Sequence, residues 1–174
     1  MAACDAGTHG AGTHGAGTHG AGEHGPGEHG PGEHRGRTDT MEYERGRKDG
    51  VPSNVGPKPT FTGHAMQDTL LDDGDKGEVR VYSVVFEPGA RTYWHSHAAG
   101  QTLLVNSGEG MVENSDGDKR VVRAGDVVWS PPGEVHWHGA GPGSFLSHTA
   151  VSLGLTSWSG EVSDEHYRDA FEGA

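Results

Sequence analysis

Large hydrophobic residues are nearly absent from one end of the chain and come in short alternating runs through the rest. After Met1, residues 1–40 contain almost no large apolar side chain, so this segment cannot bury a core and is predicted to be disordered. From residue 41 onward, β-branched and aromatic runs are separated by turn residues at spacings of about 8 to 12 residues. We therefore predict a tail over 1–40 and one folded domain over 41–174.

The alternating runs predict an all-β domain. Each run ends at Gly, Pro, Asn or Asp residues, where the chain is expected to turn. The predicted strands are residues 78–86, 91–97, 101–105, 110–112, 119–123, 126–129, 135–138 and 146–153. Because no amphipathic helix separates them, they are expected to form an antiparallel sandwich or barrel. Only residues 163–171 have the pattern of a helix, with Ser163 as its cap.

Charge and cysteine content exclude several classes of protein. The chain has 13 Lys and Arg against 25 Asp and Glu, a net charge of -12. Without a basic stripe, neither nucleic acid nor an anionic membrane is an expected partner. The one cysteine, Cys4, allows no intrachain disulfide, so the fold does not depend on an oxidising compartment. Neither a signal peptide nor a membrane-spanning stretch is apparent, which makes the cytoplasm the expected location.

The tail is a pentad repeat that contains six of the 13 histidines, namely His9, His14, His19, His24, His29 and His34. Histidine-rich tracts bind transition metals, so the tail is a candidate metal-collecting arm. The alternative is a flexible extension without a selected function. We favour the alternative, because flexible ligands lose conformational entropy on binding and nothing fixes their geometry.

Two histidine-bearing motifs predict one metal site within residues 78–153. The motif residues are Gly89, His95, His97, Gln101 and Gly108, followed by Gly125, Pro131, Gly133 and His136. Side chains at positions i and i+2 of a strand lie on the same face. His95 and His97 can therefore be directed at one ion, which Gln101 and His136 would complete from neighbouring strands.

The donor set narrows the choice of metal. Three imidazoles and one amide oxygen suit manganese, iron, cobalt, nickel or zinc better than calcium or magnesium. An octahedral ion with four protein ligands would keep two positions for water or substrate. A carboxylate at position 101 would reduce the charge of the site from +2 to +1, whereas Gln101 leaves it at +2 and more Lewis acidic. Such a site favours an anionic or alkoxide-forming ligand.

Residues 89–108 and 125–136 resemble the two motifs of the cupin superfamily. Most cupins have glutamate where this chain has Gln101, and many have asparagine where it has Ala140. Residues 86–97, 100–103, 125–129 and 136–140 are similar to bacterial cupin hydroxynitrile lyases, which are manganese-dependent enzymes that cleave or form cyanohydrins such as mandelonitrile. The similarity runs from about Phe61 to Arg168. It implies a cupin β-barrel, that is, an antiparallel double-stranded β-helix or jelly roll, and a homodimer.

The resemblance also implies roles for individual residues. His95, His97, Gln101 and His136 would bind manganese, or alternatively iron, cobalt, nickel or zinc. Thr92, His138 and His148 would line the substrate pocket and carry catalysis. Independently of the family, His138 has the strand parity of His136, and a buried His148 needs a polar partner. A neutral imidazole there could accept a hydroxyl proton or return one to departing cyanide. Ser152 replaces a glutamine of the lyases.

Three functions remain open at this point. The first is a carbon–carbon lyase acting on a small cyanohydrin or aldehyde, the second a cupin dioxygenase, and the third a non-enzymatic cupin that binds a metal or small molecule. Trp94, Trp129 and Trp137 alternate with inward residues and are expected to serve packing or a dimer interface. Arg91 and Glu87 are expected to be solvated or structural charges, and His64 and His166 belong to no predicted site.

Overall fold

The computed structural model describes residues 52–73 and 78–172. The predictions for the tail at 1–40 fall outside these residues, as does the start of the predicted domain. No helix in this described part of the chain is long and apolar enough to cross a membrane.

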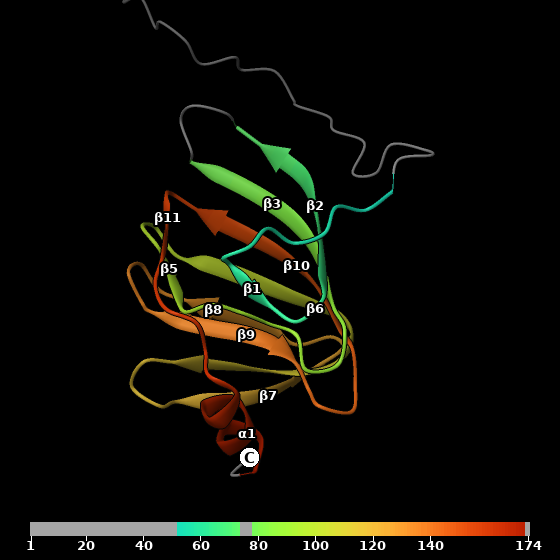
Figure 1. Cartoon of the computed structure of the whole chain (residues 1–174). Coiled ribbons are helices and arrows are strands. Elements are labelled where there is room, and N and C mark those ends of the chain that lie inside the picture. Colours follow the sequence, from blue (N-terminus) through green and yellow to red (C-terminus); the bar gives the residue numbers. More distant parts are fainter. Residues whose placement is uncertain (1–51, 74–77, 173–174) are drawn as a thin grey trace, which may run out of the picture. The chain divides into compact units, whose positions relative to one another are not determined.

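The structure is an antiparallel β-barrel with one helix at its C-terminal end (Figure 1). Every strand pair is antiparallel. The elements are β1 (Phe61–Thr62), β2 (Ala65–Asp72), β3 (Val79–Phe86), β4 (Arg91–Thr92), β5 (His95–His97), β6 (Gln101–Asn114), β7 (Lys119–Arg123), β8 (Val127–Ser130), β9 (His136–Ala140), β10 (Leu146–Leu153), β11 (Thr156–Trp158) and α1 (Asp164–Glu172).

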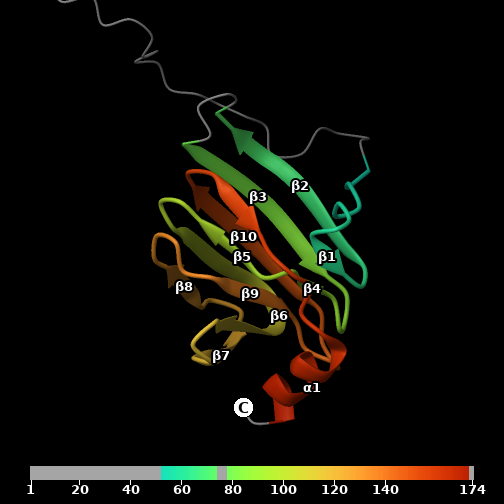
Figure 2. The same ribbon diagram turned by 60° about the vertical axis from the view of Figure 1, so that its left-hand side comes forward.

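Strand β6 belongs to both halves of the barrel. Its first part pairs with β10 and β8, and its last part pairs with β7 and β9. The bend lies near Gly108, which has a φ of 82°, and a Cβ atom there would overlap the carbonyl group of Phe145. Glycine is therefore required where the strand passes from one half to the other. The strands run in the order β1-β4-β9-β6-β10-β3-β2 and nearly close the barrel (Figure 2).

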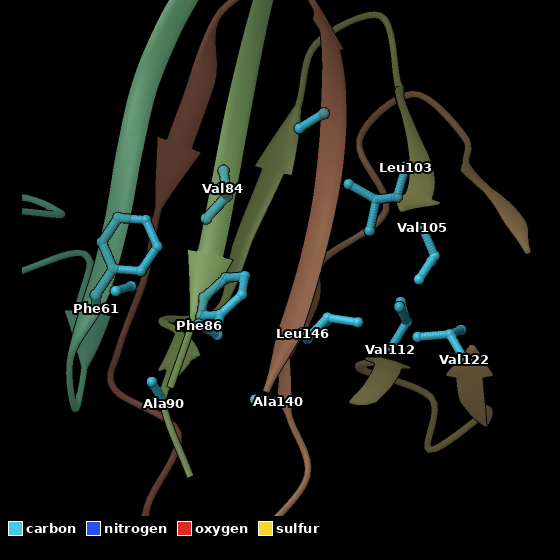
Figure 3. Close-up of a cluster of buried hydrophobic side chains, with 12 residues drawn as sticks. Phe61, Val84, Phe86, Ala90, Leu103, Val105, Val112, Val122, Ala140 and Leu146 are labelled. Carbon is cyan, nitrogen blue, oxygen red and sulfur yellow. The ribbon is translucent and has the colours of Figure 1, made fainter. Parts of the chain in front are cut away.

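Two hydrophobic clusters hold the fold together. The larger one fills one end of the barrel interior (Figure 3) and consists of Phe61, Ala65, Val84, Phe86, Ala90, Leu103, Val105, Val112, Val122, Ala140, Leu146 and Ala150. The second lies on the outer side of β9, beneath α1, and consists of Met111, Trp137, Val162, Tyr167 and Ala170. Strand β9 is buried along its whole length, because its inward histidines face the barrel interior while its outward Trp137 is covered by the helix.

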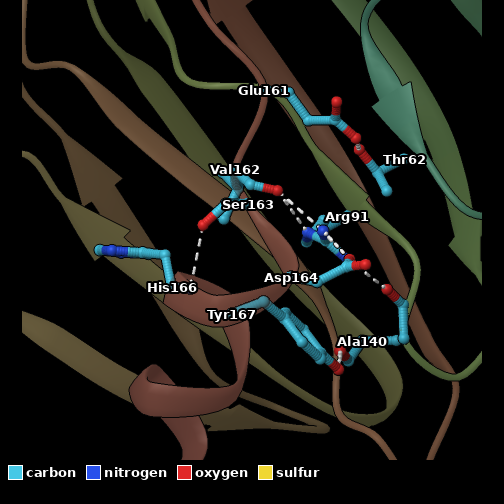
Figure 4. A network of polar contacts seen from close by, with 10 residues as sticks. Thr62, Arg91, Ala140, Glu161, Val162, Ser163, Asp164, His166 and Tyr167 are labelled. Carbon is cyan, nitrogen blue, oxygen red and sulfur yellow. Dashed lines mark hydrogen bonds and ion pairs between the residues drawn. The ribbon is translucent and has the colours of Figure 1, made fainter.

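A buried arginine connects the C-terminal segment to the barrel through hydrogen bonds and an ion pair (Figure 4). Arg91 donates through Nε and Nη2 to the carbonyl oxygen of Val162, at 3.1 and 2.7 Å, and pairs with Asp164 at 2.7 Å. Its guanidinium lies 4.8 Å from the ring centroid of Tyr167, whose hydroxyl donates to the carbonyl oxygen of Ala140. The structural role expected for Arg91 is thus confirmed. The predicted helix cap is also present, since the backbone N–H of His166 donates to Ser163 Oγ at 3.0 Å.

Four features of the predicted strand pattern differ in the structure. The predicted strand at 91–97 is divided into β4 and β5, whereas those at 101–105 and 110–112 are parts of one strand, β6. Gly108 was expected to end a strand, but it permits a bend within β6, and Gly110 permits close packing against Gly139. Strands β1, β2 and β11 were not predicted, because β1 and β11 are very short and β2 mixes polar and apolar residues without strict alternation.

Candidate metal centre

The predicted metal ligands meet in the barrel interior. His95 and His97 come from β5, Gln101 from the start of β6, and His136 from the start of β9. All four side chains are buried. The ring centroid of His95 lies 5.1 Å from that of His97 and 4.4 Å from that of His136. The i and i+2 rule thus placed the two β5 histidines on one face, as expected.

A fifth polar residue adjoins this group. His138 follows His136 by two residues on β9, and its ring centroid lies 5.2 Å from that of His95. The ligand atoms of His95, His136 and His138 all lie within 4.8 Å of one another. Three buried imidazoles at this spacing are able to hold a transition metal ion.

Hydrogen bonds orient the imidazoles toward the centre of the group. His95 Nδ1 lies 2.9 Å from the carbonyl oxygen of Tyr93, and His136 Nδ1 lies 3.0 Å from that of Glu134. A carbonyl oxygen only accepts, so each Nδ1 carries the proton and each Nε2 keeps its lone pair. This arrangement of a backbone acceptor behind the ring is common for histidines that bind metals.

Two further observations fit a cation at this place. Gln101 Nε2 donates to Ser152 Oγ at 3.0 Å, which directs Gln101 Oε1 to within 3.1 Å of His136 Nε2. Both of these atoms are acceptors, so they do not form a hydrogen bond with each other. The distance between them is close to that between two adjacent ligand atoms that each lie about 2.1 Å from the same ion. His97 Nε2 is buried and has no hydrogen-bond partner among the residues described, while its Nδ1 lies 3.0 Å from Thr156 Oγ1.

The histidines of the centre are neutral near pH 7. Burial lowers the pKa of His97 and of His148 to about 4. Burial also lowers the pKa of His95, His136 and His138, assisted for His95 and His138 by the neighbouring imidazoles. A metal ion therefore does not have to displace protons from these nitrogens at neutral pH.

The metal-free protein is expected to lose stability as the pH falls from 6.5 toward 4. In this window the unfolded chain protonates its histidines while buried His148 stays neutral, so unfolding takes up protons. The pKa of about 4, against an ordinary 6.5, corresponds to about 3 kcal/mol for this one residue by the lower limit of the window. Urea titrations between pH 6.5 and 5, where most carboxyl groups remain ionised, measure the slope. A free energy of unfolding that stays constant over this range would contradict the prediction.

His148 lies behind His138 rather than in the pocket wall. Its Nε2 is 3.2 Å from His138 Nδ1, its ring centroid is 5.5 Å from that of Phe86, and it is fully buried. The described residues that line the neighbouring cavity include His138 and Thr92 but not His148. Its expected place in the pocket wall is therefore corrected. His148 lies opposite Val105, where one extra residue of β6, Asn106, shifts the pairing with β10, and its ring packs against Phe86. Its required polar partner is His138.

A cavity of about 390 Å³ opens beside the histidines, a volume that suits a small molecule. Its walls contain four polar residues of the centre, His95, His97, Gln101 and His138, but not His136. An apolar part is formed by Phe61, Val84, Ala150, Leu155 and Trp158. Trp158 was not among the residues predicted for the site, yet its ring centroid lies 4.7 Å from that of His95. The only signal was the alternation of Thr156 and Trp158 on a three-residue strand, which is too short to assign a face.

The other aromatic and charged residues singled out in the sequence lie away from this cavity. Trp137 and Trp94 belong to the cluster beneath α1, and Trp129 is half-exposed on the outside of the barrel. These positions agree with the expected direction of all three side chains. His64 pairs with Glu87 at 2.9 Å, and the His166 side chain contacts Glu113 at 3.0 Å outside the barrel.

Comparison with known proteins agrees with this geometry. Residues 82–148 match the Cupin domain family. Over 120 residues the chain is 44% identical to the (R)-mandelonitrile lyase of Granulicella tundricola, a match that covers 67% of this chain and 92% of the relative. The chain belongs to the cupin superfamily. This cupin also matches a cupin-like protein of Thermotoga maritima, with 41% identity, a TM-score of 0.67, and coverage of 73% of its own chain and 100% of the other.

A more distant structure shares the fold of this cupin. The polyketide cyclase RemF of Streptomyces resistomycificus has 21% identity and a TM-score of 0.57, and the match covers 73% of this chain and 92% of that chain. At this identity the likeness concerns the β-barrel alone. The predicted cupin barrel, with its antiparallel strands and short C-terminal helix, is thus confirmed.

Proposed function

We propose that this cupin is a metal-dependent carbon–carbon lyase that cleaves cyanohydrins to an aldehyde and hydrogen cyanide. The observation that carries the proposal is the buried pair of His138 and His148 beside the metal-binding histidines. It provides a route for the one proton that the reaction moves. The identity of 44% with an (R)-mandelonitrile lyase, over 92% of that protein, supports the same assignment.

The metal would be held by His95, His97, Gln101 and His136, with manganese as the first candidate and iron, cobalt, nickel or zinc as alternatives. Support comes from the buried, unpaired His97 Nε2 and from the short approach of Gln101 Oε1 to His136 Nε2. Because all four donors are neutral, they leave the full +2 charge at the site. When bound, the ion supplies Lewis acidity toward the hydroxyl oxygen of the substrate.

His138 is placed to move the proton. Its Nδ1 faces His148 Nε2, so its Nε2 is the atom available to the cavity. In the proposed step His138 Nε2 takes the hydroxyl proton, the carbon–oxygen double bond forms, and cyanide leaves with the electron pair of the carbon–carbon bond. The proton then passes to cyanide, which balances the reaction. The lowered pKa of His138 makes its protonated form a strong acid toward the leaving group.

Thr92 and the apolar wall have supporting roles. Thr92 Oγ1 accepts a hydrogen bond of 3.1 Å from the backbone N–H of His138, so the hydroxyl hydrogen is free to donate to a ligand in the cavity that Thr92 lines. Phe61, Leu155 and Trp158 add apolar surface to the cavity wall, which suits an aryl group.

The proposal is tested with purified full-length protein. Metal analysis of the protein as isolated identifies the bound ion, and cyanide release from racemic mandelonitrile is then measured with the protein loaded with that ion and with manganese. Manganese-loaded protein that releases no cyanide would contradict the lyase assignment. Oxygen uptake in the presence of an organic substrate would point to a dioxygenase instead.

We also propose that this cupin forms a homodimer through the outer face of β6 and β8. Leu104, Val127 and Trp129 are 40, 65 and 51% exposed and lie on this face, with Leu104 opposite Val127. A self-complementary face of this kind suits a twofold pair.

The dimer is tested by Val127→Glu, which places two like charges in the apolar contact. Light scattering after size-exclusion chromatography is expected to give a dimer for the wild type and a monomer for the variant. Arg120→Glu, at an exposed site on β7, is the matched control and is expected to remain dimeric. A monomeric wild type would overturn this proposal.

A further inference from the structure

One charged side chain lines the cavity at a distance from the histidines. Arg80 lies on β3, directly opposite Ser152 of β10, and Ser152 lies opposite Gln101 of β6. The three residues form one row across the inner face of the sheet, and all three line the cavity. Arg80 and Gln101 are two strand spacings apart, which is about 10 Å between their Cα atoms.

The described part of the cavity wall contains no negative charge that would offset the positive charge of Arg80. The chain carries 25 acidic and 13 basic residues, yet the described residues around the cavity include no Asp or Glu, and Arg80 is the one among them with a fixed charge. With a divalent ion at the histidines, both ends of the cavity would be positive. A cavity with walls of one sign raises the local concentration of ligands of the opposite sign.

The contact between Arg80 and Asp72 leaves most of the guanidinium available. Arg80 Nε lies 3.4 Å from Asp72 Oδ1, and the two side chains are 21 and 46% exposed. This distance is long for a charge-assisted hydrogen bond, which is about 2.7–2.9 Å. Among the described residues no hydrogen bond occupies the two terminal nitrogens of Arg80, which carry four N–H donors. These nitrogens form the fork that binds a planar carboxylate in a bidentate manner.

One neutral group accompanies Arg80 at this end of the cavity. Tyr82 is the next inward residue of β3 and also lines the cavity. Burial raises the pKa of Tyr82, so its hydroxyl remains a hydrogen-bond donor at neutral pH. Tyr82 can therefore donate a hydrogen bond to an anion that pairs with the Arg80 guanidinium.

On the basis of the proposed lyase function, we propose that the substrate carries a carboxylate on the side remote from the reacting carbon and that Arg80 binds it. The row from Gln101 to Arg80 leaves room for one aromatic ring between the metal site and the acid group, and Phe61 and Trp158 supply apolar walls for that ring. The substrate class is therefore an acid-substituted aromatic cyanohydrin or its aldehyde, rather than unsubstituted mandelonitrile.

Binding is tested first, because it requires no turnover. Calorimetric titration of the metal-loaded full-length protein with 4-formylbenzoate and with benzaldehyde is expected to show at least tenfold tighter binding of the carboxylate. Arg80→Leu is expected to lose this preference, and Arg80→Lys, which keeps the charge without the fork, to retain part of it. Arg120→Leu, which removes an exposed arginine on β7, serves as the control and keeps the wild-type preference. Circular dichroism verifies that each variant is folded.

Turnover provides the second measurement. In the wild type, kcat/KM for 4-carboxymandelonitrile is expected to exceed that for mandelonitrile more than tenfold. In Arg80→Leu this ratio is expected to fall about tenfold or more, because KM for the carboxylated substrate rises. Equal binding of both aldehydes by the wild type, or an unchanged preference in Arg80→Leu, would overturn the inference. If Arg80-dependent carboxylate binding is found but neither cyanohydrin is cleaved, the lyase proposal fails while the assigned ligand class stands.

Discussion

His136→Ala is expected to abolish tight metal binding and, with it, cyanide release from mandelonitrile. The substitution removes the Nε2 atom that approaches both Gln101 and the ring of His95. Loss of a supporting hydrogen bond behind a ligand already weakens metal affinity by about 10- to 100-fold, so loss of the ligand itself should weaken it by at least about 100-fold. Metal content after gel filtration and a calorimetric titration with Mn²⁺ measure the effect.

His64→Ala is the matched control for this experiment. It also removes one imidazole, but from a half-exposed position where the side chain pairs with Glu87. It is expected to keep the wild-type metal content and turnover. A His136→Ala protein that binds stoichiometric metal at wild-type affinity would show that the ion lies elsewhere.

His148→Ala is expected to keep its metal and lose most of its catalytic rate. His148 is the hydrogen-bond partner of His138 Nδ1, and it does not line the cavity among the residues that the structure describes. It therefore acts as a positioning residue that orients His138. General acid–base catalysis contributes about 10²- to 10⁴-fold to rate, so kcat should fall by about 100-fold or more while KM changes little.

Three measurements separate this role from simple loss of structure. Metal content should stay at the wild-type level, and the pH profile of kcat should shift because the base has lost its partner. His148→Gln, whose amide can still bond to His138, should recover part of the rate. His166→Ala, outside the barrel, should behave as the wild type. Full activity of His148→Ala would remove the His138–His148 pair from the mechanism.

The local signals in the sequence predicted most of the strands and the shared direction of His95 and His97, because both depend on short-range geometry. The i and i+2 spacing of His95 and His97 determines that they share a face of any strand. Glycines were harder to interpret, since Gly108 was expected to end a strand but permits a bend within one. Whether a glycine ends a strand depends on what packs against it, here the carbonyl group of Phe145, and that neighbour is distant in sequence.

Residues whose role depends on strand pairing could not be assigned in advance. Trp158 and Thr156 reach the histidines only because β11 pairs with β5, and nothing in a three-residue strand indicates that pairing. Similarly, Arg80 lies opposite Ser152 through the register of β3 and β10. Parity along β10 does turn His148 inward, but its depth behind His138 depends on a bulge and on the packing of Phe86.

The sequence by itself determined the class of fold, the net negative charge and a set of neutral side-chain donors suited to a transition metal. These properties follow from composition, from period-two alternation and from the spacing of four residues, all of which are carried along the chain. The tertiary structure alone decided which side chains surround the metal centre, that His138 stands between the cavity and His148, and that one arginine faces an otherwise uncharged wall. Such contacts join strands far apart in sequence, and barrel closure sets their register.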